Sequence, residues 1–386
     1  MKKVCIVTGS RAEYGLLKPI MEEIKNDKDL KLQLVATGAH LSSEFGLTYK
    51  NIERDGFFID EKVEMLLSSD TKIGINKSIG LAIISFGEVF QRLNPDIVVI
   101  LGDRYEILAV SIAAMINNIK LAHLHGGEIT EGAIDDTIRH CITKMSHIHF
   151  TSTEEYRRRV IQLGEIPEYV FNVGAIGTEN VKKLKLLSKE ELEESINFNI
   201  KKNTIVVTFH PVTLESISSK EQFKSILDAI NRIENINVIF TKANADTDGR
   251  IINDMIDEYV DKNKNAIAFD TMGQIKYFSA IKYVDAVVGN SSSGIIEVPS
   301  FGIPTVNIGI RQKGRITCDS VINCKVEVSE IKKAIEKALS HEFRNEIKNC
   351  KNPYEKNDTC KNIVFLIKQF LNKNVDCSKK FYNINF

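Results

Sequence analysis

Short apolar runs alternate with longer amphipathic stretches along most of this chain. In the first half, runs rich in Val and Ile that are typical of buried strands lie at residues 4–7, 32–37, 96–101, 120–125 and 147–150. Stretches with the apolar spacing of helices lie at residues 74–92, 105–117, 134–145 and 153–163. Because a buried strand is repeatedly followed by a helix, the pattern predicts a parallel sheet with helices on both faces.

The same alternation restarts in the second half of the chain. It pauses around residues 174–203, where Ser188 and Glu191 predict a capping box on a surface helix. New strand-like runs then follow at 204–209, 236–241, 266–269, 285–289 and 304–309. A chain of 386 residues is also long for one domain. We therefore predict an α/β fold of two Rossmann-like, doubly wound domains with an interdomain cleft.

The predicted domains are residues 1–175 and 176–356, followed by a C-terminal helix and tail at 357–386. We expect that last segment to pack back on one of the two halves, and the N-terminal domain is the first candidate.

Composition narrows the class of protein. Lys and Arg together number 51, and Asp and Glu together also number 51. The net charge is therefore zero and does not indicate a nucleic-acid partner. The first apolar run is far too short for a signal peptide or a membrane span, so we expect no membrane partner. The seven cysteines are odd in number and form no CxxC pair. We expect them to be reduced and the protein to be cytoplasmic.

Two polar motifs follow predicted strands in the first half. "TGSRAEYG" at 8–15 matches neither a dinucleotide fingerprint nor a Walker A loop. Its backbone N–H groups, the following helix and Arg11 nonetheless suit an anion. The alternative is a surface arginine on an ordinary loop. After the run 96–101, Asp103 and Arg104 are placed to face a ligand, and the alternative is that Asp103 caps the next helix.

The stretch "HLHGGEITEGAIDDTIRH" at 123–140 holds three histidines, four acidic residues and an arginine around two adjacent glycines. Alternation places His123 and His125 on one strand face, which a zinc site with Glu128 would use, but no spacing fixes a further ligand and HExxH is absent. We therefore expect no metal, and interpret His123 as a core histidine and Glu128 as the functional candidate. Asp135 and Asp136 begin a helix, either as caps or, with Arg139 and His140, as residues that face the cleft.

The second half carries the strongest motif. In "GNSSSG" at 289–294, Ser291, Ser292, Ser293 and Gly294 follow a strand and precede an apolar helix start. Hydroxyls and N–H groups at such a turn can bind phosphate, and the alternative is a plain capped helix. Glu297 could accept hydrogen bonds from ribose hydroxyls, Arg311 adds positive charge, and His210 follows the strand 204–209. A diphosphate site together with carboxylates fits a nucleotide-sugar enzyme.

The motifs "TGSRAEYG", "GDRYE", "HGGE", "IDDTIRH", "FHPVT", "GNSSSG" and "GIRQKGR" together resemble the hydrolysing UDP-N-acetylglucosamine 2-epimerases of bacterial sialic-acid synthesis. The resemblance implies a GT-B type fold of two Rossmann-like domains. It also implies elimination of UDP to a 2-acetamidoglucal, followed by hydration to N-acetylmannosamine. No metal or nicotinamide cofactor is implied, and a homo-oligomer, either dimer or tetramer, is expected.

By motif, the resemblance assigns acid/base roles to Asp103 and Glu128, a third acidic position to Asp135 or Asp136, and a place near the diphosphate to His210. The implied UDP-binding and substrate positions are Arg11, Arg104, Ser291, Ser292, Glu297, Arg311 and, less directly, Asn244; Ser293 and Gly294 complete the phosphate turn.

The sugar is not fixed by these motifs. Relatives within the family act on UDP-N,N′-diacetylbacillosamine in legionaminic acid synthesis. The two sugars differ in their groups at C4 and C6, and we expect the loops 38–50 or 63–74 to contact these groups. We expect UDP-N-acetylglucosamine, on family prevalence. Three further alternatives are a non-hydrolysing 2-epimerase, a GT-B glycosyltransferase and a UDP-sugar sensor.

Overall fold

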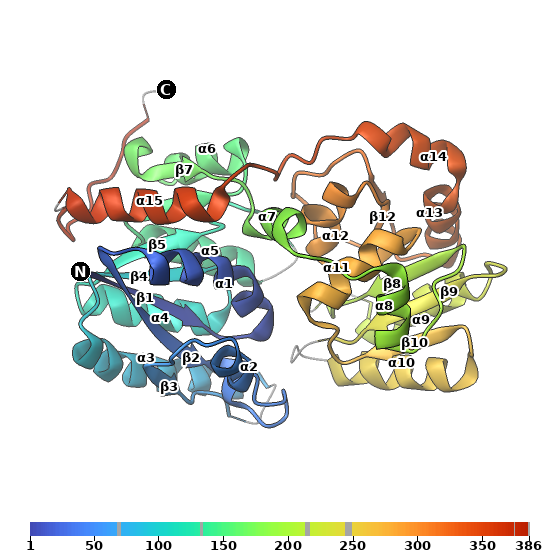
Figure 1. Cartoon of the computed structure of the whole chain (residues 1–386), viewed down its shortest axis with the longest axis horizontal. Coiled ribbons are helices and arrows are strands. Elements are labelled where there is room, and N and C mark those ends of the chain that lie inside the picture. Colours follow the sequence, from blue (N-terminus) through green and yellow to red (C-terminus); the bar gives the residue numbers. More distant parts are fainter. Residues whose placement is uncertain (68–70, 132–133, 213–216, 244–248, 374, 385–386) are drawn as a thin grey trace. The chain divides into compact units, whose positions relative to one another are not determined.

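The computed structural model describes residues 1–67, 71–131, 134–212, 217–243, 249–373 and 375–384. Contacts along the chain divide it into two compact units (Figure 1). Unit 1 consists of Met1–Glu128, Ile134–Glu179 and Lys356–Phe386, and unit 2 of Ile129–Ala133 and Asn180–Glu355. Unit 1 is therefore built from separated segments of the sequence.

Unit 1 contains a seven-stranded sheet in the order β3-β2-β1-β4-β5-β6-β7, in which every neighbouring pair is parallel. Its strands are β1 (Lys2–Thr8), β2 (Leu30–Thr37), β3 (Glu61–Val63), β4 (Ile97–Leu101), β5 (Lys120–Leu124), β6 (Ile148–Thr151) and β7 (Val170–Asn172). Its helices are α1 (Arg11–Asn26), α2 (Tyr49–Arg54), α3 (Lys72–Leu93), α4 (Tyr105–Ile116), α5 (Ile134–Met145), α6 (Glu154–Gln162) and α15 (Thr359–Asn372), with 3-10 turns η1 (Gly38–Leu41) and η2 (Pro167–Tyr169).

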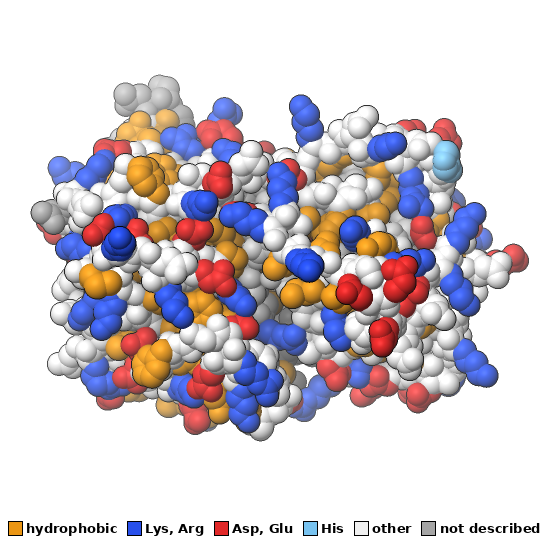
Figure 2. All heavy atoms as spheres, in the orientation of Figure 1, with side chains coloured by type: hydrophobic (Ala, Val, Ile, Leu, Met, Phe, Trp, Pro, Cys, Tyr) orange, Lys and Arg blue, Asp and Glu red, His pale blue; other side chains and the backbone are white. Residues whose placement is uncertain are grey.

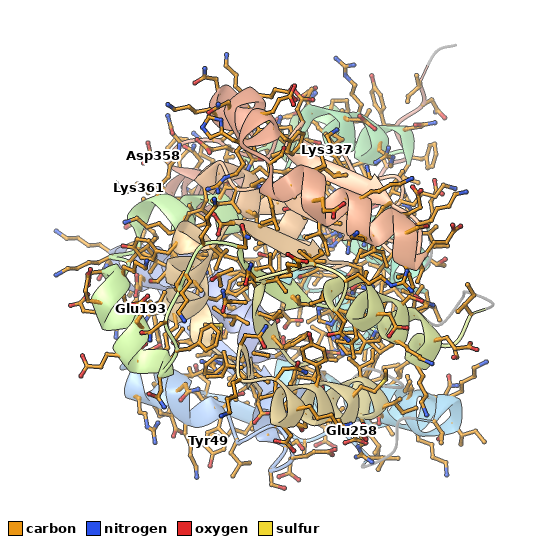
Figure 3. The ribbon with its side chains drawn as sticks, turned by 90° about the vertical axis from the view of Figure 1, so that its right-hand side faces the viewer. Tyr49, Glu193, Glu258, Lys337, Asp358 and Lys361 are labelled. Carbon is orange, nitrogen blue, oxygen red and sulfur yellow. A yellow bond between two sulfur atoms is a disulfide. The ribbon has the colours of Figure 1, made fainter. Side chains whose placement is uncertain are left out.

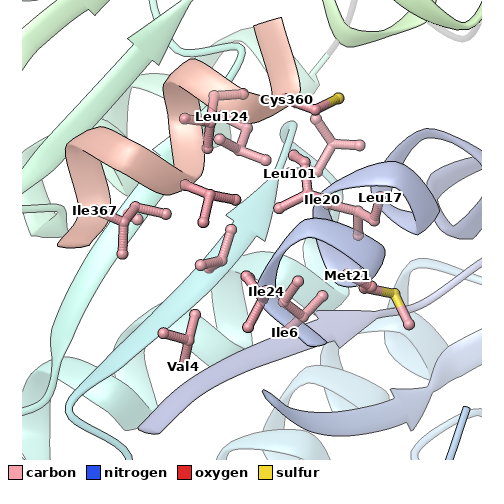
Figure 4. Close-up of a cluster of buried hydrophobic side chains, with 14 of the residues drawn as sticks. Val4, Ile6, Leu17, Ile20, Met21, Ile24, Leu101, Leu124, Cys360 and Ile367 are labelled. Atoms are coloured by element: carbon pink, nitrogen blue, oxygen red, sulfur yellow. The ribbon is translucent and has the colours of Figure 1, made fainter. Parts of the chain in front are cut away.

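The two faces of this sheet have separate cores, as the alternation of strand residues requires. Val4 and Ile6 of β1 pack with α1 and α15, whereas Cys5 and Val7 pack with α3 and α4. Figure 4 shows the first of these cores, in which Ile367 of α15 lies over the strands beside α1. The last long helix of the chain thus completes a core that the first strand begins.

Unit 2 contains a six-stranded parallel sheet in the order β10-β9-β8-β11-β12-β13. Its strands are β8 (Thr204–Thr208), β9 (Asn237–Thr241), β10 (Ala266–Phe269), β11 (Ala286–Gly289), β12 (Thr305–Ile308) and β13 (Val321–Cys324). Its helices are α8 (Lys189–Ile196), α9 (Ser219–Ile230), α10 (Gly249–Lys262), α11 (Gly273–Tyr283), α12 (Ser293–Ile296), α13 (Val328–Leu339) and α14 (His341–Glu346), with η3 (Val298–Phe301) and η4 (Ile347–Asn349). Helix α7 (Ile176–Lys183) spans the boundary between the units.

The predicted fold class is confirmed, because each unit is a doubly wound parallel sheet covered on both faces. In unit 2, α9, α10 and α13 cover one face, and the charged side chains labelled on α10 and α13 in Figure 3, Glu258 and Lys337, are exposed. Every predicted strand is present, and the predicted capping box forms between Ser188 and Glu191. On the face in Figure 2, positive and negative side chains are interspersed, in line with the balanced composition.

One helix among the described residues, α3, is long and apolar enough to pass a length-and-composition test for a membrane span. About a third of its most apolar window (33%) is buried within the protein. Ala82, Phe86, Val89 and Phe90 of this helix lie in the core beneath the sheet. Core helices of water-soluble proteins pass the same test.

The expectation that all cysteines are reduced is wrong for one pair. Cys318 and Cys350 form a disulfide within unit 2, with their Cα atoms 6.9 Å apart. These residues are separated by 32 positions in the sequence, so no short spacing pattern could reveal the pair. The fold brings them together by returning η4 to the segment before β13.

Candidate functional site

The order of strands reverses between β1 and β4 in unit 1 and between β8 and β11 in unit 2. Ligands of open α/β sheets bind at such a reversal, outside the carboxyl ends of the strands. Several of the predicted site residues follow these four strands. Arg11 follows β1, Asp103 and Arg104 follow β4, His210 follows β8, and the serine turn follows β11. Each unit therefore presents a candidate site of its own.

In unit 1, the candidate carboxylates are organised around Arg139 of α5. Its guanidinium donates hydrogen bonds to the carboxylate of Asp103, to Asp136 Oδ1 at 3.1 Å and to the backbone oxygen of Glu128 at 2.6 Å. The side chain of Arg139 is 1% exposed, whereas those of Asp103 and Asp136 are 24% and 26% exposed. A buried arginine thus fixes two carboxylates that remain open to a ligand. Asp135, the alternative third acid, is half-buried beside Asp136 on α5.

Glu128 lies on the turn that follows β5 and is 3% exposed. Ser152 Oγ donates to Glu128 Oε1 at 2.9 Å, and His125 Nδ1 lies 3.3 Å from the same oxygen. His125 Nε2 accepts from the backbone N–H of Ile176 at 3.4 Å. In a neutral imidazole one nitrogen accepts and the other donates, so this bond assigns the proton to Nδ1, facing Glu128. Ser152 and His125 therefore hold the carboxylate in place.

The two strand histidines do not share a face, contrary to the sequence interpretation. β5 ends at Leu124, and His125 turns out of the strand with a φ of 65°. His123 is fully buried, its Nε2 donates to the Gly102 oxygen at 2.8 Å, and burial lowers its pKa to about 3. It is the core histidine that we predicted. Among the residues that the structure describes, no group of three His, Cys, Asp or Glu side chains could hold a metal ion.

The arginines flank the strand reversal in unit 1. Ser10 caps α1 by accepting from the N–H of Glu13, and Arg11 begins that helix. Arg104, not Asp103, is the N-cap residue of α4, and no side-chain hydrogen bond caps this helix. The capping alternative for Asp103 is therefore wrong, and its carboxylate pairs with Arg139 instead. Arg104 Nε donates to Glu106 Oε1 at 2.8 Å.

In unit 2, Asn290 connects three loops of the candidate site through hydrogen bonds. Its amide accepts from the backbone N–H of His210 at 2.7 Å and donates to the His210 oxygen at 2.8 Å. Its own backbone oxygen accepts from Arg311 Nη1 at 3.1 Å and from Gln312 Nε2 at 2.8 Å. Asn290 is 1% exposed. We did not single it out from the sequence, although a polar residue directly after a buried strand is a usable signal.

The serine turn precedes a very short helix. α12 has only four residues, and Glu297, 8% exposed, ends it. Ser291 Oγ accepts from the N–H of Ser293, and Ser293 Oγ accepts from Tyr277 Oη at 3.2 Å. A phosphate at this turn would therefore be bound by hydroxyl and N–H groups more than by the end of a long helix. Asn244 lies outside the described residues.

Comparisons with known proteins identify the family of the chain. A sequence profile of the UDP-N-acetylglucosamine 2-epimerase family matches residues 22–368. The chain is 47% identical over 344 residues, 89% of each chain, to the GDP/UDP-N,N′-diacetylbacillosamine 2-epimerase (hydrolyzing) of Campylobacter jejuni. It is 41% identical over 385 residues, 100% of this chain and 98% of the relative, to the polysialic acid biosynthesis protein P7 of Escherichia coli.

The fold also matches solved structures. A UDP co-structure of MnaA from S. aureus superposes with a TM-score of 0.81 at 17% identity, covering 96% of this chain and 97% of that one. At this identity the likeness concerns the fold, which is of the GT-B type. Because the family profile covers most of the chain and the relatives in sequence span nearly all of it, this chain belongs to the UDP-N-acetylglucosamine 2-epimerase family and to its hydrolysing type.

Proposed function

We propose that this enzyme eliminates the nucleoside diphosphate from a UDP-linked 2-acetamido sugar and hydrates the product with inversion at C2. In the first step a carboxylate takes the C2 proton, a C1–C2 double bond forms and the C1–O bond to the diphosphate breaks. In the second step water adds its oxygen to C1 and a proton reaches C2 from the opposite face. The products are the free 2-epimeric sugar and UDP.

The observation that carries this proposal is the arrangement of Asp103, Asp136 and Glu128 around the buried Arg139. No carbonyl acidifies the C2 proton, so its removal must be coupled to departure of the diphosphate. A base and an acid on different sides of the sugar are needed, and several fixed carboxylates can fill these roles. We propose Asp103, Glu128 and one of Asp135 and Asp136 for them, with His210 near the diphosphate.

We propose that the leaving UDP is bound by Arg11, Arg104, Ser291, Ser292, Ser293, Gly294, Glu297, Arg311 and Asn244. Arginines and N–H groups stabilise negative charge that develops on a leaving diphosphate. Glu297, a buried carboxylate just beyond the serine turn, suits the ribose hydroxyls.

For the sugar, we favour UDP-N,N′-diacetylbacillosamine over the N-acetylglucosamine expected from the sequence. The support is the 47% identity to a C. jejuni relative that is named for that sugar. UDP-N-acetylglucosamine is the second candidate, supported by the 41% identity over the whole chain to a protein named for polysialic acid biosynthesis.

Proton NMR in D₂O would test both the reaction and the sugar. The purified protein is incubated separately with each UDP-sugar and, because the C. jejuni relative is named for GDP as well, with the GDP-linked bacillosamine. Release of free nucleotide together with a 2-epimeric sugar deuterated at C2 supports the reaction. The faster substrate identifies the sugar and the nucleotide. No turnover of any of the three would contradict the proposed function.

We also propose that the protein is a homo-oligomer, either a dimer or a tetramer, that acts in the cytoplasm. The oligomer is supported by exposed apolar side chains, namely Leu81 and Ile84 on α3 and Met115 and Ile116 on α4. Sedimentation of the wild type and of Ile84→Glu tests the oligomer, with Ile275→Glu, an exposed isoleucine on α11 of unit 2, as the control. A wild-type monomer would contradict this proposal.

A further inference from the structure

Two buried carboxyl groups flank Gly9 in the turn that follows β1. Glu13 Oε2 of α1 accepts the N–H of Gly9 at 2.7 Å. Glu106 of α4 packs against the same glycine, because a Cβ atom built on Gly9 would lie 2.9 Å from Glu106 Cγ and 3.1 Å from its Oε1. Glu13 is 8% exposed and Glu106 is 3% exposed. Both buried acidic side chains thus pack against Gly9.

Positive charge beside this pair is limited. Arg104 Nε reaches Glu106 Oε1 at 2.8 Å, but Glu106 Oε2 is buried without a hydrogen-bond partner among the described residues. Asp103 adds a further negative charge nearby. Two buried carboxylates that share one guanidinium are costly when both are ionised, because burial and like charge both disfavour the charged form.

We propose that Glu13 holds a proton beside Glu106, and that this proton allows the turn of Gly9 to Arg11 to bind an anion such as a nucleoside diphosphate. That the anion is UDP rests on the proposed function. If both carboxyl groups were ionised, their two negative charges would offset the positive charges of Arg11 and Arg104, which attract the anion. Anion binding therefore favours the protonated pair, and the protein takes up a proton when it binds UDP at a pH where the pair has lost it.

Burial and the surrounding charges together place the loss of this proton just above neutral pH. Burial, and next the charge of Glu106, raise the pKa of Glu13 to about 8, although the Gly9 N–H and Arg104 oppose them. His40, which packs on Thr8 beside the turn, does not titrate in this range, because burial lowers its pKa to about 4. A phosphate monoester has its second pKa at about 6, so the diphosphate of UDP is mostly ionised at pH 7 and changes little above it. The uracil N3–H begins to ionise toward pH 9, but it is the same for every variant, so a loss of UDP affinity that the wild type shows and Glu13→Gln lacks reports on the protein.

The test is isothermal titration of the full chain with UDP at pH 7, 8 and 9, in two buffers of different ionisation enthalpy. For the wild type we expect affinity to fall about fivefold or more from pH 7 to 9, because one linked proton changes affinity by up to tenfold per pH unit. We also expect net proton uptake at pH 8. Glu13→Gln and Glu106→Gln should each bind UDP with little dependence on pH. Glu165→Gln, which removes a buried carboxylate elsewhere in unit 1, should keep the wild-type dependence.

A second readout does not need the ligand. A carboxyl whose folded pKa is raised destabilises the fold as pH rises from its unfolded value to its folded value. The unfolding free energy of the wild type should therefore fall relative to Glu13→Gln between about pH 4.5 and 8. UDP affinity that is constant from pH 7 to 9, or equal dependence in Glu13→Gln, would overturn the inference. Failure to bind UDP at pH 7 with this stability change present would instead contradict the proposed function.

Discussion

Asp103 and Arg139 form an ion pair in which the arginine is almost completely buried and the carboxylate is not. They lie 36 residues apart, after β4 and within α5. The pair therefore links the carboxyl end of a central strand to a helix on the face of the sheet. It also leaves one side of the carboxylate open, which a group that exchanges protons with a substrate requires.

Neutralising either proposed acid/base carboxylate should abolish turnover and spare nucleotide binding. We expect Asp103→Asn or Glu128→Gln to lower kcat by about 10²–10⁴-fold, the usual contribution of a positioned acid or base. Calorimetry with UDP should give wild-type affinity for both variants, since neither side chain is proposed to bind the nucleotide. Unchanged kcat in both variants would remove these residues from the mechanism.

Loss of Arg139 should damage the fold as well as the reaction. Arg139→Ala removes the buried donor to the carboxylate of Asp103 and to the backbone oxygen of Glu128, and breaking a buried ion pair costs about 3–5 kcal/mol. We expect a loss of that order in the free energy of unfolding by urea. Arg92→Ala is the matched control, because its pair with Glu61 lies on the surface, where such pairs contribute about 1 kcal/mol or less. Equal losses for the two variants would contradict the organising role of Arg139.

Gly127 should not tolerate a side chain. Its φ is 79°, and a Cβ atom would lie 2.5 Å from the backbone oxygen of Tyr156. We expect Gly127→Ala to lose both stability and turnover, because any shift of the turn displaces Glu128. Gly56→Ala is the control, since Gly56 has a φ of 82° but open space around it, and backbone strain alone costs about 1–2 kcal/mol. If the two variants unfold at the same urea concentration, steric contact at Gly127 is not the cause.

In unit 2, we expect Glu297→Ala or Arg311→Ala to weaken UDP binding about tenfold or more, since each removes a charged hydrogen-bonding group worth roughly 1.5–3 kcal/mol. Titration calorimetry with UDP measures this directly. Lys333→Ala, on the exposed side of α13, is a control that should leave affinity unchanged. Full affinity in both variants would move the nucleotide site away from the serine turn.

Acid should destabilise unit 1 through Glu165. Burial raises the pKa of this carboxyl, but the hydrogen bond from His149 and the charges of Lys379 and Lys144 outweigh it and lower the pKa to about 2. A depressed carboxyl pKa stabilises the fold above the unfolded value near 4.5, and this contribution is lost as pH falls toward 2.

We therefore expect Glu165→Gln to be less stable than the wild type by roughly 3 kcal/mol at pH 7. The difference should shrink between pH 4.5 and 2 in urea titrations. A difference that is independent of pH would show that packing, and not charge, holds Glu165.

The sequence was sufficient for most of the fold because central parallel strands are continuous Val- and Ile-rich runs. The three missed strands, β3, β7 and β13, all lie at sheet edges and have three or four residues. An edge strand is partly exposed and needs no apolar run, so "EKV" at β3 carries no strand signal. These strands form because the neighbouring strand offers free backbone groups, and short-range pattern does not encode that.

The candidate site was located from the sequence only as far as topology allowed. Parallel strands bring their carboxyl ends to one edge, so Asp103 and Glu128 could be placed near each other. Their partners depend on packing between distant segments. Asn290 meets His210 across 80 positions, and Arg139 was interpreted only as one residue of a helix face. Such contacts are determined by how the helices pack against the sheet, which depends on residues far apart in the sequence.

The position of α15 also bears on how the protein is made. Ribosomes deliver the chain from its N-terminus, and every strand of the unit 1 sheet emerges before any residue of α8. The side chains of Ile363, Ile367 and Phe370 that complete the core on this face of the sheet arrive only after unit 2 has been synthesised. Unit 2 can therefore fold during translation, whereas unit 1 must wait with an apolar face uncovered. Until α15 is released from the ribosome, this apolar face of the nascent chain stays exposed. Binding by a chaperone or rapid completion of synthesis would protect it from aggregation.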